Sequence, residues 1–167
     1  RVLFTMQPPS PSPNESKQIK IPYHPRPLQR EMHNELYNNG NRVRFAVLAI
    51  HRRFGKTIFA INELIAGALT CPLQHPKFFY LAPTYKQAKS IAWEYLKDFT
   101  RAIPRMKYYE TELKAVFPNG AMIWLHGAEN FDALRGNYCD GVVLDEWGNM
   151  SPLVYKEVLR PALSDRK

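Results

Sequence analysis

The chain has 167 residues, of which 45% are hydrophobic, and its 23 lysines and arginines outnumber 15 acids, which gives a net charge of +8 and an isoelectric point near 9.6. This length suits one domain with its own core, while no apolar run long enough to span a membrane and no signal peptide are present. The positive charge favours a polyanionic partner.

The N-terminal residues 1–20 are rich in proline and serine and have no apolar periodicity. This composition predicts a disordered tail, followed by one folded domain over residues 21–167. The prolines within Tyr23–Pro27 disfavour helix before them and predict an extended entry to this domain. Leu28–Tyr37 then predicts a helix, which the turn-forming Asn38–Gly40 ends.

A possible phosphate-binding loop follows, and it is the most informative stretch of the chain. The apolar run Phe45–Ile50 predicts a strand, His51–Thr57 forms a short basic loop, and Ile58–Leu69 predicts a helix. A helix that starts at Lys56 or Thr57 directs its unpaired N–H groups and its positive dipole end at the loop.

The residue types in this loop suit a nucleotide, although the pattern departs from the common one. Gly55 lets the backbone approach a phosphate, the Lys56 ammonium can reach the β- and γ-phosphates, and the Thr57 hydroxyl can bind Mg²⁺. The common pattern has a glycine where Ile50 stands, and two arginines occupy positions where small residues are usual. The alternative is a basic turn in which Thr57 caps the following helix.

The middle of the chain predicts a strand, a helix and a hairpin. Lys77–Ala82 is the strand, and Thr84 is placed to cap a helix over Tyr85–Phe99. The apolar stripe of that helix consists of Ala88, Ile91, Ala92, Tyr95, Leu96 and Phe99. An Asn-Gly turn between Leu113–Phe117 and Ala121–His126 predicts a hairpin that extends one side of the sheet.

A second candidate motif is a pair of acids after an apolar run. Gly141–Leu144 predicts a fully buried central strand, and Asp145 and Glu146 follow it directly. At the carboxyl edge of a parallel sheet, Asp145 can hold Mg²⁺ through a water and Glu146 can polarise an attacking water. The alternative is an acidic turn in which Asp145 caps the helix predicted over Pro152–Leu159.

Strands that alternate with helices predict an α/β fold with parallel strands at the centre of the sheet. Together with the loop and the acid pair, this pattern indicates a P-loop NTPase of the ASCE type, a three-layer sandwich around a mostly parallel sheet. The nucleotide would bind at the carboxyl ends of the strands.

In this order, the motifs resemble the ATPase domain of the large terminase subunit of tailed bacteriophages, the motor that packages viral DNA into preformed capsids. The resemblance covers roughly Tyr23–Arg166. His51–Thr57 resembles the family's deviant Walker A motif, which tends to carry an early arginine, and Phe79–Ala88 resembles its next strand and helix. Leu134–Gly136 with Val142–Trp147 resembles its Walker B region.

The resemblance implies roles for individual residues. It assigns nucleotide binding to Gln29, Arg53, Phe54, Gly55, Lys56 and Thr57, metal binding to Thr57 and Asp145, and catalysis to Glu146, Arg135 and Arg52. Gln29 stands where the family places an adenine-reading glutamine, whose amide can pair with N6 and N7 of the base. The alternative is that Gln29 is only a polar residue at an exposed helix start. Tyr23 could stack on the base or pack as a core aromatic.

Two arginines compete for the role of stabilising charge at the γ-phosphate. Arg135 could reach into a neighbouring subunit as a trans-acting finger, and Arg52 could sense the nucleotide state within its own subunit. The alternative for Arg135 is a structural salt bridge.

The resemblance also implies ATP and Mg²⁺ as cofactors and double-stranded DNA, a homo-oligomeric ring, a portal protein and a small terminase subunit as partners, with no membrane. We expect the protein in the cytoplasm of an infected bacterial cell, where Cys71 and Cys139, which lack metal-like spacing, would be free thiols. The family's coupling motif and nuclease domain normally follow the acidic strand, and the chain ends at Lys167 before either. We therefore expect an N-terminal piece of a larger enzyme, without DNA cleavage.

Two other functions stay open from the sequence. A helicase-like P-loop ATPase would also use the acid pair, although Asp145–Gly148 differs from the Asp-Glu-x-His and Asp-Glu-x-Asp motifs of many helicases. A nucleotide-binding assembly module that is inactive in isolation would use the same loop without hydrolysis.

Overall fold

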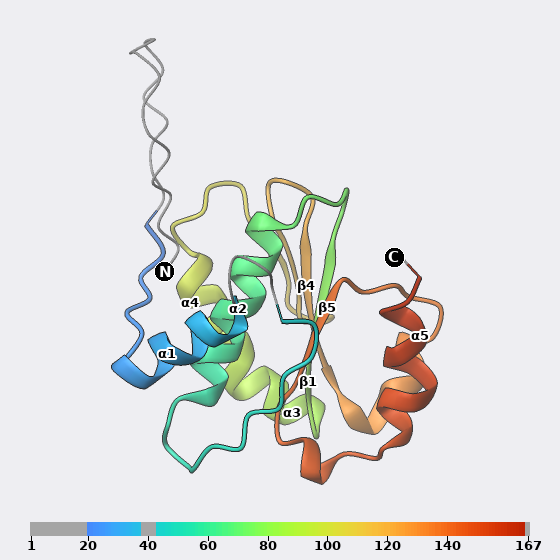
Figure 1. Cartoon of the computed structure of the whole chain (residues 1–167). Helices are drawn as coiled ribbons and strands as arrows, with labels where there is room; N and C mark the ends of the chain where they lie inside the picture. Colours follow the sequence, from blue (N-terminus) through green and yellow to red (C-terminus); the bar gives the residue numbers. More distant parts are fainter. Residues whose placement is uncertain (1–19, 38–42, 166–167) are drawn as a thin grey trace.

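A computed structural model describes residues 20–37 and 43–165 and contains one five-stranded sheet (Figure 1). The strands are β1 (Lys77–Ala82), β2 (Lys107–Tyr109), β3 (Lys114–Val116), β4 (Met122–Gly127) and β5 (Gly141–Leu144), in the spatial order β2-β3-β4-β1-β5. β1 pairs in parallel with β4 and β5, whereas β2, β3 and β4 pair antiparallel. The expected α/β fold with a parallel core is therefore confirmed. The predicted tail, apart from Lys20, and the turn at 38–40 lie outside the described residues.

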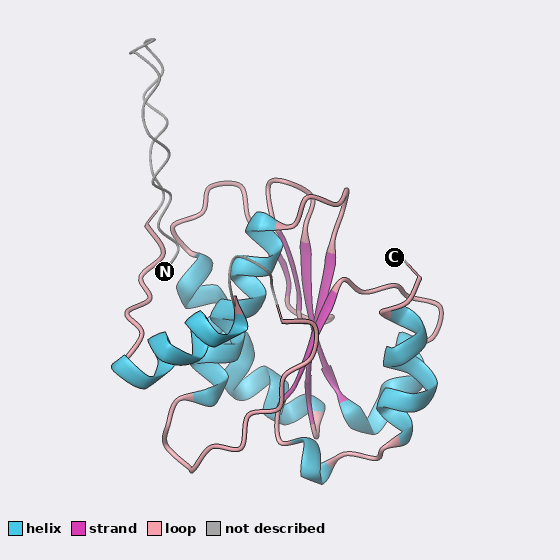
Figure 2. Ribbon diagram, viewed as in Figure 1, coloured by secondary structure: helices cyan, strands magenta, loops and turns pink. Residues whose placement is uncertain are grey.

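Helices cover both faces of the sheet, as Figure 2 shows. The helices are α1 (Pro27–Leu36), α2 (Lys56–Thr70), α3 (Tyr85–Gln87), α4 (Glu94–Thr100) and α5 (Arg160–Ala162), with π-helical segments η2 (Ala88–Trp93) and η5 (Val154–Leu159) and 3₁₀ segments η3 (Ala128–Leu134) and η4 (Trp147–Asn149). In Figure 1, α1, α2 and α4 lie on one side of the sheet and α5 on the other. No helix within the described ranges is both long and apolar enough to cross a membrane.

Alternate side chains of β1 enter two separate hydrophobic cores, because successive residues of a strand point to opposite faces. Phe78 and Tyr80 pack with α2 and α4 in the first core. Phe79 and Leu81 pack with η5 in the second. This alternation explains why a strand buried on both faces is almost entirely apolar and aromatic.

The N-terminal segment is attached to α2 by a buried polar network. His33 of α1 bonds Glu63 of α2 through Nδ1, and the Tyr23 hydroxyl lies 2.8 Å from Nε2 of the same imidazole. The half-buried Tyr23 ring packs edge-on against His33 and Phe99. This network orients α1 so that its first turn faces the loop before α2.

Most of the predicted elements are confirmed. α1 and α2 match their predicted ranges within two residues, β1 matches its range, and β3 and β4 form the predicted hairpin at one side of the sheet. The Thr84 hydroxyl accepts the Gln87 N–H and caps the helix that continues through η2 and α4. Sequence analysis missed β2, which is only three residues long.

The predicted stripe on the helix after Thr84 is partly wrong, because η2 has π-helical rather than α-helical periodicity. Ile91, expected inside, is 50% exposed, whereas Trp93, which was not expected inside, is fully buried. A single π turn adds a residue to the helical turn, and the residues that follow rotate onto a different face.

The predicted strand at Phe45–Ile50 is wrong: no strand forms there, and Phe45 and Val47 are 69% and 78% exposed. A strand needs a neighbouring edge to bond its backbone, and no described strand pairs with this segment. The related prediction that Gly141–Leu144 is a fully buried central strand is also wrong. β5 lies at the edge of the sheet beside β1 alone, and its residues are only partly buried.

His126 of β4 makes the stability of this fold depend on pH. Its ring packs against Trp124 and Phe79, and its Nε2 is buried without a partner among the described residues. Burial lowers the pKa of His126 from 6.5 to about 4. Between these values the unfolded chain binds a proton that the folded chain does not, so the free energy of unfolding falls as the pH falls.

We expect His126→Phe to remove this dependence between pH 6.5 and 4, which amounts to about 3 kcal/mol at most. Urea unfolding at several pH values would measure it, with the exposed His24→Gln as the control variant. Parallel stability profiles for the parent protein and His126→Phe would contradict the prediction.

Candidate active site

The loop before α2 has the backbone shape of an anion-binding turn. Arg53 and Gly55 have positive φ angles of 64° and 90°, and the first helical bond of α2 runs from the Phe59 N–H to the Gly55 carbonyl. The amides at the start of α2 therefore precede the helical bonding ladder. Together with the dipole of this 15-residue helix, they favour an anion at the loop.

Gly55 is favoured by its backbone conformation and by the space around it. Its φ of +90° is strained for any residue with a side chain, and an added Cβ would lie 2.9 Å from the Gln29 amide nitrogen and 3.1 Å from the Arg26 guanidinium. The predicted role of Gly55, close approach of the backbone to a phosphate, stays a prediction.

Gln29 is 2% exposed and holds the loop in place. Its amide nitrogen donates to the carbonyl oxygens of Gly55 at 3.2 Å and Phe54 at 3.4 Å, and its Oε1 accepts the Arg26 N–H at 3.0 Å. The alternative of an exposed polar residue at the helix start is therefore wrong. The adenine-reading role stays a prediction, since the same amide already bonds the loop backbone.

The two predicted binding residues before Gly55 differ in their surroundings. Phe54 is 9% exposed, and its ring packs edge-on with His51, so this side chain anchors the loop. Arg53 has an exposed side chain, and its carbonyl accepts a long 3.5 Å bond from the Arg26 guanidinium. In both residues the loop geometry makes the backbone, rather than the side chain, the group that is suited to contact a phosphate.

Lys56 follows at the first position of α2, and its ammonium donates to the Ile50 carbonyl at 3.3 Å. This bond turns the amine back across the loop rather than along the helix. A cation held there stands beside the free amides at the start of α2 and can pair with a phosphate oxygen.

The loop meets the acidic strand through one hydrogen bond. The Thr57 hydroxyl donates to Asp145 Oδ2 at 3.0 Å, across 88 positions of sequence. The backbone of Asp145 extends the parallel ladder of β5, because its N–H donates to the Leu81 carbonyl at 2.9 Å. The two predicted metal ligands, separated in sequence, are therefore adjacent in the fold.

Tyr80 is a further site residue that sequence analysis missed. It is 2% exposed, and its hydroxyl donates to Asp145 Oδ2 at 2.6 Å. Burial and the neighbouring Asp145 carboxylate raise the pKa of Tyr80 well above its ordinary value. The available signal was a tyrosine in the predicted apolar strand Lys77–Ala82, because a phenol that is buried requires a polar partner.

Glu146 occupies a strained position at the carboxyl end of β5. Its φ is 55°, in the left-handed region, and its exposed carboxylate accepts a long 3.5 Å bond from the Asn149 amide. A non-glycine residue in this region costs on the order of 1–3 kcal/mol, and such residues cluster at functional sites.

The two candidate arginines lie in different settings. Arg135, next to η3, donates to Asp132 at 2.7 Å and to Glu157 of η5 at 2.8 Å, so its salt bridges tie these two elements together. These two hydrogen bonds raise the pKa of Arg135. Arg52 lies exposed in the loop itself.

The chemistry of the two facing oxygens suits Mg²⁺. A hydroxyl and a carboxylate are hard ligands, and Mg²⁺ usually takes only one or two such protein ligands beside water and phosphate. No group of three or more His, Cys, Asp or Glu side chains in residues 20–37 and 43–165 could hold a metal by itself. Thr57 and Asp145 therefore fit a metal ion that is shared with a nucleotide.

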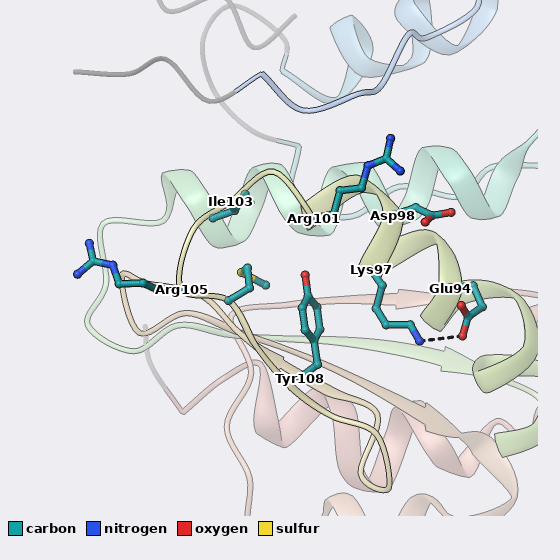
Figure 3. Close-up of a pocket in the computed structure, with 8 residues that line it drawn as sticks. Glu94, Lys97, Asp98, Arg101, Ile103, Arg105 and Tyr108 are labelled. Carbon is teal, nitrogen blue, oxygen red and sulfur yellow. Dashed lines mark ion pairs between the residues drawn. The ribbon is translucent and has the colours of Figure 1, made fainter. Parts of the chain in front are cut away.

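A separate hollow of about 440 Å³ lies beside α4, and none of the candidate residues lines it (Figure 3). It is lined by Glu94, Lys97, Asp98, Arg101, Ile103, Arg105, Met106 and Tyr108. Lys97 is paired with Glu94 at 3.0 Å and Glu110 at 3.2 Å. The lining has three basic and two acidic side chains, and it is separate from the loop before α2 and the acid pair after β5.

Solved structures with a similar fold come from phage large terminases. The ATPase domain of the Thermus phage P74-26 large terminase aligns with a TM-score of 0.65 and 22% identity over 85% of this chain and 61% of that chain. The chain has the fold of a phage large terminase ATPase domain. An arginine-to-alanine mutant of the Thermus phage domain aligns with a TM-score of 0.64 at 22% identity. No family model and no curated protein sequence matches the chain.

A more distant terminase shows how much of such an enzyme this chain spans. The large terminase of a thermophilic bacteriophage aligns with a TM-score of 0.56 and 19% identity, over 68% of this chain but only 29% of that one. The chain thus spans about three fifths of the Thermus phage terminase ATPase domain and under a third of the longer terminase.

Proposed function

We propose that this chain is the ATPase domain of a viral DNA-packaging terminase large subunit, which binds and hydrolyses ATP–Mg²⁺ to translocate double-stranded DNA into a capsid. The observation that carries the proposal is the 3.0 Å bond between Thr57 and Asp145. It joins the loop at the start of α2 to the carboxyl end of β5, where ligands of parallel sheets bind. The likeness in fold to terminase ATPase domains supports the same reading.

Each site residue takes a role that its geometry supports. The amides of the loop and of the first turn of α2 bind phosphate oxygens, and Lys56 adds the positive charge. The Thr57 hydroxyl, which donates a hydrogen bond to Asp145 in this structure, can offer an oxygen lone pair to Mg²⁺. When bound, Mg²⁺ would neutralise the charge that develops on the phosphates.

Glu146 is the residue that we assign to water activation. Its carboxylate is exposed, next in sequence to Asp145, and held by a strained turn rather than by an ion pair among the described residues. A carboxylate that accepts the proton of a water orients that water for attack on the γ-phosphorus.

Arg52 and Arg135 are proposed to stabilise negative charge during hydrolysis. Arg52 belongs to the loop and suits a sensor within its own subunit. Arg135 suits a finger that acts on a neighbouring subunit, and for this role its guanidinium must leave Asp132 and Glu157. Both pairs are exposed, and exposed pairs contribute little, so ring assembly can compete with them.

The proposed partners follow from charge and from the fold. A net charge of +8 favours the DNA backbone, which a motor can track without reading sequence. A homo-oligomeric ring, a portal protein and a small terminase subunit would complete the machine in the cytoplasm of the bacterial host.

Nucleotide binding by the purified protein tests this proposal. We expect ATP to bind with a stoichiometry of one, Mg²⁺ to tighten the binding, and the complex to be more stable than the free protein by about 3 kcal/mol at a hundredfold excess over Kd. Calorimetry and thermal denaturation would measure both effects. Absence of binding with and without Mg²⁺ would refute the proposal.

Assays of phosphate release and strand separation would discriminate the alternatives. Stabilisation by ATP without phosphate release favours the assembly module. Unwinding of duplex DNA favours the helicase-like ATPase.

A further inference from the structure

The Tyr80 side chain joins β1 to the acid at the end of β5. In the parallel register Tyr80 lies opposite Val143 of β5, and Asp145, just after the end of β5, is two residues further along on the same face. A phenol is long enough to cover this diagonal step, and its hydroxyl reaches Asp145 Oδ2 at 2.6 Å. An aliphatic residue, which parallel strands usually have at such a position, could not make this contact.

The hydrogen bonds at Asp145 are compatible with a bound metal. Oδ2 accepts one proton from Tyr80 and one from Thr57, so neither donor requires Oδ1. The Thr57 hydroxyl has to adjust when it binds a metal, whereas the Tyr80 hydroxyl, which also interacts with Thr57, is carried by a ring that is fixed in the hydrophobic core. Tyr80 is thus the donor that keeps the carboxylate in one orientation before and after metal binding.

We propose that Tyr80 is a positioning residue that orients Asp145 for the Mg²⁺ of the bound nucleotide. This inference rests on the proposed function. Partners that orient metal ligands in this way typically contribute about 10–100-fold to metal affinity or activity.

A purely structural role is the competing explanation, and Tyr108 provides a matched control. Its hydroxyl bonds Thr100 at 2.7 Å, and its ring packs against the same hydrophobic core, away from Asp145. Tyr80→Phe and Tyr108→Phe each remove one tyrosine hydroxyl with a side-chain partner, but only the first removes a partner of the acid.

The test measures the binding of ATP with EDTA and across a Mg²⁺ titration by calorimetry, and the binding of Mn²⁺ to the ATP complex by electron paramagnetic resonance. For Tyr80→Phe we expect unchanged ATP binding in EDTA, with Mg²⁺ and Mn²⁺ affinities lower by about 10–100-fold. Excess Mg²⁺ should restore much of kcat while the apparent KM for Mg²⁺ stays raised. Tyr108→Phe should match the parent protein in metal affinity.

Equal metal affinities in Tyr80→Phe and the parent protein would overturn this inference and leave the proposed function intact. Equal losses in Tyr80→Phe and Tyr108→Phe would also overturn it. If the parent protein itself shows no effect of Mg²⁺, the proposed function fails, and the inference with it.

A measurement on the unsubstituted protein covers the case in which Tyr80→Phe does not fold. With tyrosine labelled at ¹³Cζ, Mg²⁺ added to the ATP complex should shift one tyrosine signal, and Mn²⁺ should broaden the same signal. If no tyrosine signal responds to either metal while ATP is bound, Tyr80 does not orient the metal ligand.

Discussion

Lys56→Ala is expected to weaken ATP binding by about 10–100-fold and to abolish turnover, because a hydrogen bond to a charged group contributes roughly 1.5–3 kcal/mol. The ammonium is already bent across the loop, where it bonds the Ile50 carbonyl at 3.3 Å. A phosphate seated on the amides of α2 would meet this cation, and alanine offers no substitute. Calorimetry with ATP and Mg²⁺ and a phosphate-release assay would measure the two effects.

The matched control is Lys86→Ala, which removes an exposed lysine of α3 outside the loop. This variant should bind ATP as the parent protein does. If Lys56→Ala binds and hydrolyses ATP as well as Lys86→Ala, the loop at 51–57 is not the phosphate site. A Lys56→Arg variant, which keeps the charge but changes its shape, is expected to retain part of the binding and little of the turnover.

Glu146→Gln has the second large effect, and it should separate hydrolysis from binding. Glutamine preserves the size of the side chain but cannot take a proton, so turnover should fall by about 10²–10⁴-fold. ATP affinity should stay near that of the parent protein, because Glu146 is not among the residues placed at the phosphates. Single-turnover phosphate release and calorimetry on the same sample would distinguish the two quantities.

Glu94→Gln is the control for this substitution, since Glu94 is an exposed acid of α4 outside the loop and acid pair. It should leave turnover unchanged. Turnover retained in Glu146→Gln would remove this residue from the catalytic role. Loss of both binding and thermal stability would instead indicate that the strained turn, with its φ of 55°, depends on the carboxylate.

The local elements of the fold were predictable because their signals lie in adjacent residues. β1 follows from six apolar or long side chains before a proline, and the helix after it from the Thr84 cap. The prediction for Phe45–Ile50 was wrong for a physical reason: an apolar run specifies a preference for extended backbone but does not supply the strand that must pair with it. The π-helical segment η2 could not be predicted either, because an apolar stripe is read with the α-helical period of 3.6 residues.

In the candidate site, too, local motifs were predictable and contacts between distant segments were not. Gly55, Lys56, Thr57, Asp145 and Glu146 were chosen from two short motifs, and the 3.0 Å bond between Thr57 and Asp145 joins those motifs. No motif predicted that the Gln29 amide bonds the loop, or that Arg135 pairs with Glu157. These contacts depend on which elements are neighbours, and the local pattern contains no such information.

The sequence by itself determined the chemical groups of the candidate site, their order along the chain, and most of the helices and strands around them. Only the tertiary structure decided that β5 is an edge strand, that Phe45–Ile50 stays unpaired, and that Tyr80 contacts Asp145. The reason is that helical and strand periodicity depends on residues that are close in the sequence. Strand order and register instead arise from pairings between distant segments.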